Sequence, residues 1–254
     1  YPINTIADEL GLFVSTDGKK AYFASNQLDG IGGWDLYSFD LYEDAKPQKV
    51  LFLKGELRDE NNNLLDNASI QLKNIRTKEK QHVPVKNGFY TTALTVGKSD
   101  DILLIINKKG YAFNSTYIST SDDKFSSPKE LDFEVETLNK GKAFRLDNIY
   151  FASNSFELNP ISMEILTAFV DYLILNKNLR VGIHGHTDNV GGNLENLLLS
   201  TNRAKAVYSF LLDNRIKKDR LNFKGFGEQK PLASNETKKG RAQNRRTEFV
   251  ILGQ

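Results

Sequence analysis

A regular alternation of strand-like and helix-like segments, beginning near Asn139, is the feature that most constrains the fold of this chain. Residues 159–177 and 193–214 have the apolar periodicity of amphipathic helices. The first has a proline in its first turn and an inward stripe of Ile161, Ile165, Phe169 and Leu173. The second is expected to face inward through Leu197, Ala204, Val207 and Leu211. Strands are predicted at 145–152, 179–186, 220–227 and 244–252. Residues 138–254 are therefore predicted to form an α/β unit with helices on one face of a sheet.

The first 137 residues lack this alternation and predict only β-structure. Residues 1–50 contain short alternating runs at Leu12–Ser15, Lys20–Ala24 and Trp34–Phe39, with turn signals at Thr16–Gly18 and Asp29–Gly33. This pattern predicts a small antiparallel meander. Residues 51–137 contain short polar strands between Asn- and Gly-containing turns, which predicts a small β-sandwich. We therefore expect a multidomain α+β protein with domains at 1–50, 51–137 and 138–254.

Composition excludes several classes of protein. The chain has 34 basic and 32 acidic residues, so no overall field attracts it to nucleic acid, and no nucleic-acid partner is expected. It has no cysteine, which excludes disulfides and Cys-ligated metal. The longest apolar runs, such as Ile102–Ile106, are too short to cross a bilayer. Because the chain starts with Tyr1 rather than Met, we expect any signal peptide or lipoprotein cysteine to lie upstream.

Candidate binding residues cluster after the predicted strand at 179–186. Residues 185–192 combine glycines with short polar side chains, and they place Asp188 at the carboxyl end of the strand. Ligands of open α/β sheets tend to bind there. Asn196 and Arg203 are seven positions apart on the next helix, so they share nearly one face, expected to differ from the inward face. A carboxylate, an amide and a guanidinium in this arrangement suit a zwitterionic ligand.

Three stretches in this region carry a specific resemblance: GHTDNVG at 185–191, LSTNRA at 199–204, and GFGE at 225–228 followed by GRAQNRR at 240–246. In this order and spacing they resemble the OmpA-like peptidoglycan-binding family over about a hundred residues. The resemblance implies a βαβαβ-β domain with helices on one face of a mixed sheet. It also implies that Asp188 binds the ammonium of diaminopimelate in peptidoglycan, and that Arg203 binds the carboxylate at the same centre. The other expected ligand-binding residues are Asn196, Arg245, Thr187 and Asn154.

One position departs from the family pattern. Many members have Asp in the loop after the first strand, where this chain has Ala152-Ser153. If that Asp contributes only backbone groups, nothing is lost; if its carboxylate matters, binding should be weaker here.

The N-terminal segments resemble two further families. STDGKKAYFASN and GGWDLYSFDL are similar to one blade of a PD40-type β-propeller, which would make residues 1–50 the last blade of a truncated propeller. An ordinary hairpin packed on its neighbour explains the same pattern. Gly55, residues 67–69, Gly88–Tyr90 and Gly110-Tyr111 are similar to a carboxypeptidase regulatory-like domain, which implies a seven-stranded sandwich that acts as a spacer or docking module.

The order of these domains resembles envelope proteins of the Bacteroidota, including a peptidoglycan-binding subunit associated with type IX secretion. It implies a periplasmic protein, associated with the outer membrane and the cell wall. Other envelope proteins would then bind through the N-terminal β domains. The alternative is an envelope scaffold whose main partner is a protein and whose OmpA-like domain is vestigial.

His184, His186 and Asp188 could suggest a metal site, but the strand is expected to end near His186, so Asp188 should leave that face. Asp188 and Glu228 are of the right type for glycan hydrolysis, but no pattern brings them together. We therefore expect no catalysis, metal or cofactor. Asp188 could instead cap the helix, and the basic residues at 238–246 are by default a solvated surface.

Overall fold

The computed structural model describes residues 9–26, 31–42, 45–46, 49–97, 100–120, 128–152 and 155–254. The chain divides into two compact units, Tyr1–Lys49 and Val50–Gln254, which are described separately. Within the described residues, no helix is both long and apolar enough to cross a membrane.

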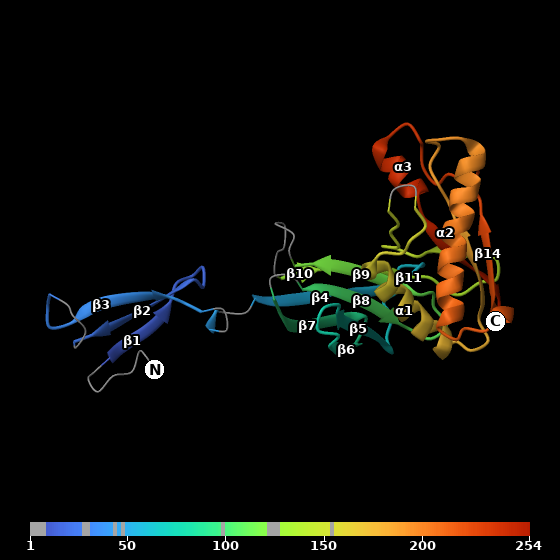
Figure 1. Ribbon diagram of the computed structural model, residues 1–254. Coiled ribbons are helices and arrows are strands. Elements are labelled where there is room, and N and C mark those ends of the chain that lie inside the picture. Colours follow the sequence, from blue (N-terminus) through green and yellow to red (C-terminus); the bar gives the residue numbers. More distant parts are fainter. Residues whose placement is uncertain are drawn as a thin grey trace. The chain divides into compact units, whose positions relative to one another are not determined.

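The first unit is a three-stranded antiparallel meander, as predicted (Figure 1). Its strands are β1 (Glu9–Val14), β2 (Lys20–Ser25) and β3 (Asp35–Asp40). The turn between β1 and β2 is closed by the Gly18 amide, which donates to Ser15 O at 2.9 Å. The Asp17 carboxylate accepts from the Ser15 hydroxyl at 2.6 Å in the same turn. The second predicted turn includes residues 29–30, which lie outside the described residues.

Two four-stranded sheets form the first half of the second unit. One sheet has the order β6-β5-β8-β9, and in the other β4 pairs with β7, β10 and β11. The strands are β4 (Lys49–Asp59), β5 (Ala68–Asn74), β6 (Lys80–Val85), β7 (Phe89–Val96), β8 (Asp101–Asn107), β9 (Asn114–Ser119), β10 (Lys129–Glu130) and β11 (Phe133–Val135). Alternate residues of both sheets, among them Leu53, Leu57, Ile70 and Leu104, form a common apolar core.

The C-terminal half is a mixed sheet with the order β12-β15-β13-β14. β13 and β14 are parallel, whereas β15 is antiparallel to both β12 and β13. Its elements are β12 (Ala143–Arg145), α1 (Pro160–Leu175), β13 (Arg180–Gly185), α2 (Asn193–Asp213), the 3-10 helix η2 (Lys218–Arg220), β14 (Leu221–Gly225), α3 (Lys238–Asn244) and β15 (Thr247–Gly253). Val181, Ile183, Phe249 and Ile251 share a core with residues of α1 and α2, so these helices cover one face of the sheet as predicted.

Two predicted strand boundaries are wrong. The strand expected at 145–152 ends at Arg145, and beyond it only an isolated bridge joins Phe151 to Leu158. The strand expected at 244–252 begins at Thr247, because residues 238–244 form α3. The pattern misses α3 because it is short and basic, with Gly240 in its middle.

The predicted inward face of α2 is confirmed at Ala204, Val207 and Leu211, which are fully buried, and is wrong at Leu197. Leu197 is 36% exposed, whereas Asn196 is buried together with Ser200, Ala204, Val207 and Leu211. Asn196 therefore lies on the buried face of α2. In α1 the predicted stripe holds, since Ile165, Phe169 and Leu173 are fully buried.

Close contact with two glycines places α2 on the sheet. A Cβ on Gly185 would lie 2.2 Å from Ser200 O, and one on Gly225 would lie 2.3 Å from Thr201 Oγ1. Only glycine permits this approach at the ends of β13 and β14. The middle of α2 is thereby held against the carboxyl ends of two parallel strands.

Helix α1 packs against both the C-terminal sheet and the sandwich. Phe113 of the sandwich and Phe249 of β15 lie 5.2 and 5.0 Å, respectively, from the ring of Phe169. The Tyr172 hydroxyl donates to Tyr111 O at 2.9 Å. Lys73 Nζ lies 2.6 Å from the Glu164 carboxylate. Beside the core of the sandwich, the second unit thus has an apolar core that runs from β8 through α1 to β15.

Candidate ligand-binding site

A cavity of about 770 Å³ opens at the carboxyl ends of β13 and β14. Its walls come from the β12–α1 loop, the β13–α2 loop, the first half of α2, and α3. The lining residues include Asp188, Asn196, Arg203, Thr187 and Arg245, which are five of the six residues expected to bind ligand. The sixth, Asn154, lies outside the described residues.

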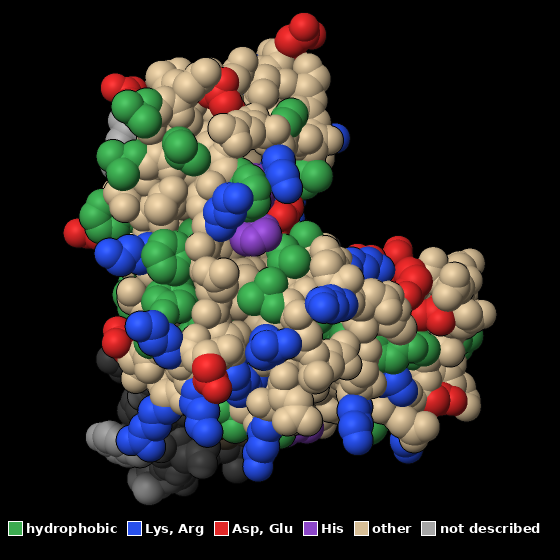
Figure 2. Space-filling view, turned by 90° about the vertical axis from the view of Figure 1, so that its right-hand side faces the viewer, with side chains coloured by type: hydrophobic (Ala, Val, Ile, Leu, Met, Phe, Trp, Pro, Cys, Tyr) green, Lys and Arg blue, Asp and Glu red, His purple; other side chains and the backbone are tan. Residues whose placement is uncertain are grey.

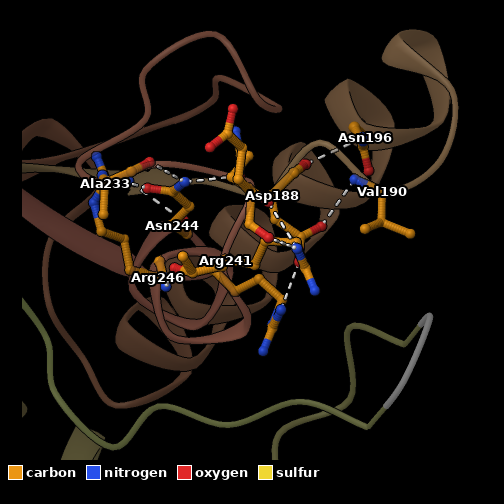
Figure 3. Close-up of polar contacts among 12 residues, drawn as sticks. Asp188, Val190, Asn196, Ala233, Arg241, Asn244 and Arg246 are labelled. Carbon is orange, nitrogen blue, oxygen red and sulfur yellow. Dashed lines mark hydrogen bonds and ion pairs between the residues drawn. The ribbon is translucent and has the colours of Figure 1, made fainter.

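Asp188 is the only acidic residue among the lining residues that the structure describes. Its Oδ1 accepts from the Val190 amide at 3.1 Å, which fixes the turn into α2. Its Oδ2 lies 2.5 Å from Arg245 Nη1. In Figure 3 Asp188 lies between Asn196 and Val190 on one side and Asn244 and Arg246 on the other. The residue before α2 is Gly192, so Asp188 is held by Arg245 and does not cap the helix.

Arg203 is a partly buried cation with no carboxylate partner among the described residues. Its Nε donates to Ser155 O at 3.0 Å, and its Nη2 donates to Ala152 O at 3.4 Å. Its guanidinium carbon lies 5.1 Å from the centre of the Phe151 ring. Burial lowers the pKa of the Arg203 guanidinium, the charge of Arg245 lowers it further, and the charge of Asp188 opposes both effects.

The departure at Ala152 costs nothing at this contact. Arg203 uses the backbone carbonyl of Ala152, which any residue would supply. The side chain of Ala152 takes no part in holding Arg203.

The Asn196 side chain fixes the β13–α2 loop through its hydrogen bonds. Its amide nitrogen donates to Asp188 O at 3.3 Å and to Glu228 Oε2 at 2.8 Å. The structure thus brings Glu228 near the Asp188 loop, which the sequence pattern does not indicate. Glu228 is bound to the Asn196 amide and is not among the residues that line the cavity.

Thr187 and His186 line the cavity at the end of β13, and His184 precedes them on the strand. The Thr187 hydroxyl is buried and has no hydrogen-bond partner in the described part of the chain, while its amide donates to Gly227 O at 3.0 Å. His184 and His186 both contact the Phe226 ring, at centroid distances of 4.8 and 5.2 Å. The histidines pack on an aromatic ring, and Asp188 is directed elsewhere, to Arg245.

Helix α3, which the sequence pattern misses, supplies basic side chains that line the cavity. Asn244 is fully buried, and its Oδ1 accepts from the amides of Leu232 and Ala233 at 2.7 and 3.0 Å. Its Nδ2 donates to Ala233 O at 2.8 Å (Figure 3). These bonds fix α3 on the preceding loop. Of the basic residues in 238–246, Lys238, Lys239 and Arg245 are exposed, as a solvated surface requires, whereas Arg246 is buried. Lys238, Arg241, Arg245 and Arg246 also line the cavity.

Glu248 forms an ion pair with Arg246, one of the residues that line the cavity. From its environment we expect the stability of the domain to depend on pH. Burial raises the pKa of Glu248, but His186 and Arg246 outweigh burial and lower this pKa to about 2. Arg246 Nε donates to Glu248 at 2.6 Å. Because the folded-state pKa lies below the unfolded-state value of 4.5, the carboxylate stabilises the fold above pH 4.5. That stabilisation is lost as the pH falls toward 2.

We expect Glu248→Gln to lower the thermal unfolding midpoint at pH 7, with a difference from wild type that shrinks as the pH falls from 4.5 to 2. Calorimetry across this range measures it. Glu236→Gln, which changes an exposed carboxylate, is the matched control and should leave the profile unchanged. A constant difference between Glu248→Gln and wild type at all pH values would contradict the prediction.

Comparison with known proteins identifies this region. Residues 150–245 match the model of the OmpA family. The peptidoglycan-binding protein ArfA of Mycobacterium tuberculosis is 40% identical over 103 residues, which cover 41% of this chain and 32% of ArfA. The outer-membrane lipoprotein YfiB of Pseudomonas aeruginosa is 28% identical over 149 residues, which cover 58% of this chain and 88% of YfiB.

A solved structure, the peptidoglycan-associated lipoprotein from Burkholderia pseudomallei, is 28% identical with a TM-score of 0.38 and covers 41% of this chain and 87% of that one. The match to ArfA spans about a third of the length of that relative. Residues 150–245 of this chain are therefore similar to domains of the OmpA family.

Proposed function

We propose that the C-terminal domain binds peptidoglycan without covalent chemistry and so anchors an envelope assembly to the cell wall. The observation that carries the proposal is Arg203, a partly buried cation without a carboxylate partner in the described residues, in the same cavity as Asp188. The family match supports it. Among the relatives, ArfA is named a peptidoglycan-binding protein and YfiB an outer-membrane lipoprotein.

Within peptidoglycan, the diaminopimelate of the stem peptide is the proposed ligand group. Its side-chain centre carries an ammonium and a carboxylate, and the cavity offers a carboxylate in Asp188 and a guanidinium in Arg203. Arg245 keeps Asp188 oriented, and oxygen lone pairs of Asp188 remain for the ammonium. Arg203 takes the carboxylate through parallel hydrogen bonds. The unpartnered Thr187 hydroxyl and the loop that includes Asn154 are proposed to complete the contacts.

For the whole chain we propose a periplasmic tether associated with the outer membrane and the wall. We propose that it belongs to type IX secretion machinery and binds other envelope proteins through its N-terminal β domains. Residues 1–50 are proposed to be a propeller-type blade and residues 51–137 a regulatory-like sandwich. Apolar side chains exposed on the first unit, among them Leu10, Leu12, Phe13 and Leu36, support a partner there.

The test is a pulldown of the chain on purified sacculi that contain diaminopimelate, with wild type compared with Asp188→Ala. Wild type should bind saturably, and Asp188→Ala should lose most of this binding, because the ammonium would lose its only carboxylate in the cavity. Calorimetry of the variant is needed alongside, since Arg245 also loses its partner.

The controls must exclude a nonspecific attraction between basic side chains on the protein surface and the anionic cell wall. Lys and Arg side chains spread across the lower part of the face in Figure 2. Lys217 and Lys218 are exposed beyond the C-terminal end of α2, whereas the cavity lies beside its first half. Lys217→Ala with Lys218→Ala should bind sacculi like wild type. Loss of binding in that variant, with binding kept in Asp188→Ala, would sink the proposal. No binding by wild type would favour the scaffold with a vestigial OmpA-type domain.

A further inference from the structure

The cavity contains more positive charge than one zwitterionic centre can balance. Its lining includes six basic residues, Arg145, Arg203, Lys238, Arg241, Arg245 and Arg246. Three of them are paired with carboxylates: Arg145 with Asp147, Arg245 with Asp188, and Arg246 with Glu248. The other three, Arg203, Lys238 and Arg241, have no carboxylate within ion-pair distance in the described part of the chain.

Arg203 is committed to the carboxylate of the zwitterionic centre by the proposed function. Two cations on α3, Lys238 and Arg241, then remain without a carboxylate partner in the described part of the chain. Arg241 uses Nη1 to donate to Asn235 O at 2.7 Å and to Glu236 O at 3.0 Å, so its position is fixed by backbone groups that leave its charge unbalanced. Lys238 is exposed and has no polar partner among the described residues. Positions three apart on a helix share a face, so these two charges lie together at the edge of the cavity.

We propose that Lys238 and Arg241 form a second anion subsite, which takes a second carboxylate of the stem peptide. The inference rests on the proposed function, since it assumes that a stem peptide occupies the cavity. A stem tetrapeptide has two such carboxylates beside the zwitterionic centre: the α-carboxylate of D-glutamate and the C-terminal carboxylate of D-alanine. Amidation of the carboxylate that Lys238 and Arg241 bind would remove its charge and weaken binding.

The experiment uses the whole chain and three soluble muropeptides that contain diaminopimelate in a tetrapeptide stem. One has both carboxylates free, one has the D-glutamate α-carboxylate amidated, and one has the C-terminal carboxylate amidated. Isothermal titration calorimetry at low and physiological salt gives the three affinities. We expect wild type to bind one amidated ligand about threefold to fivefold more weakly than the free one, as for a partly exposed ion pair. The difference should shrink at higher salt.

Lys238→Gln should abolish that preference and leave binding of the less favoured ligand unchanged. Lys239→Gln is the matched control, because Lys239 is the next residue of α3 and is exposed but does not line the cavity. The inference is overturned if wild type binds all three ligands equally, or if Lys238→Gln keeps the preference. In either case, loss of binding in Asp188→Ala would leave the proposed function standing. No binding of any muropeptide by wild type would overturn both.

Discussion

Replacing Phe169 with alanine is expected to lower the free energy of unfolding of the second unit by about 3–5 kcal/mol. Phe169 is fully buried, and its ring contacts Phe113 of the sandwich, Tyr172 of α1 and Phe249 of β15. Its removal leaves a cavity where the two halves of the unit meet, so both should lose stability together. Denaturant-induced unfolding measures the change in the free energy of unfolding, and calorimetry provides a second measurement of it.

The shared core makes a second, sharper expectation possible. Phe113→Ala changes only the sandwich side of the contact, yet it should shift the unfolding of residues 50–254 as one cooperative transition. Phe89→Ala, which truncates a half-exposed ring on β7, is the control and should have a small effect. Two separate transitions, only one of which moves with Phe113→Ala, would show that the halves fold independently and would contradict the shared core.

Replacing Arg203 with alanine is expected to weaken the binding of diaminopimelate-type muropeptide by about 30-fold to 1000-fold, equivalent to about 2–4 kcal/mol. The cost is large because the ligand carboxylate would be buried without its cation. Titration calorimetry with wild type and variant measures it. Lys205→Ala, two positions along the same helix and exposed, should bind like wild type.

A lysine-type muropeptide keeps the amine and lacks the neighbouring carboxylate. Comparing both ligands with both proteins gives the equivalent of a double-mutant cycle for the interaction between Arg203 and the carboxylate. Wild type should bind it about as weakly as Arg203→Ala binds the diaminopimelate type. Arg203→Ala should bind both types equally, since the interaction in question is already absent. If Arg203→Ala weakened both ligands by the same factor, Arg203 would act through loop positioning and not through the carboxylate.

Local patterns predicted the parts of this fold that depend on neighbours in the chain. The stripe of Ile165, Phe169 and Leu173 defines α1, because helix periodicity places them on one face. The turn signal at 185–192 placed Asp188 correctly at the end of β13, where the cavity opens. On α2 the same pattern predicts Ala204, Val207 and Leu211 correctly and misses the buried amide of Asn196, because it counts only apolar residues.

Local sequence patterns are enough to predict α1, α2 and β13, and to place Asp188 and Arg203 in one C-terminal unit. Only the tertiary structure decided that Arg245 holds Asp188, 57 positions away, and that Arg203 is held by backbone carbonyls about 50 positions before it. It also decided that α3 lines the cavity and that the sandwich shares a core with α1. These are contacts between distant segments. Periodicity and turn chemistry report the preferences of adjacent residues, and so contain no information about which distant surfaces meet.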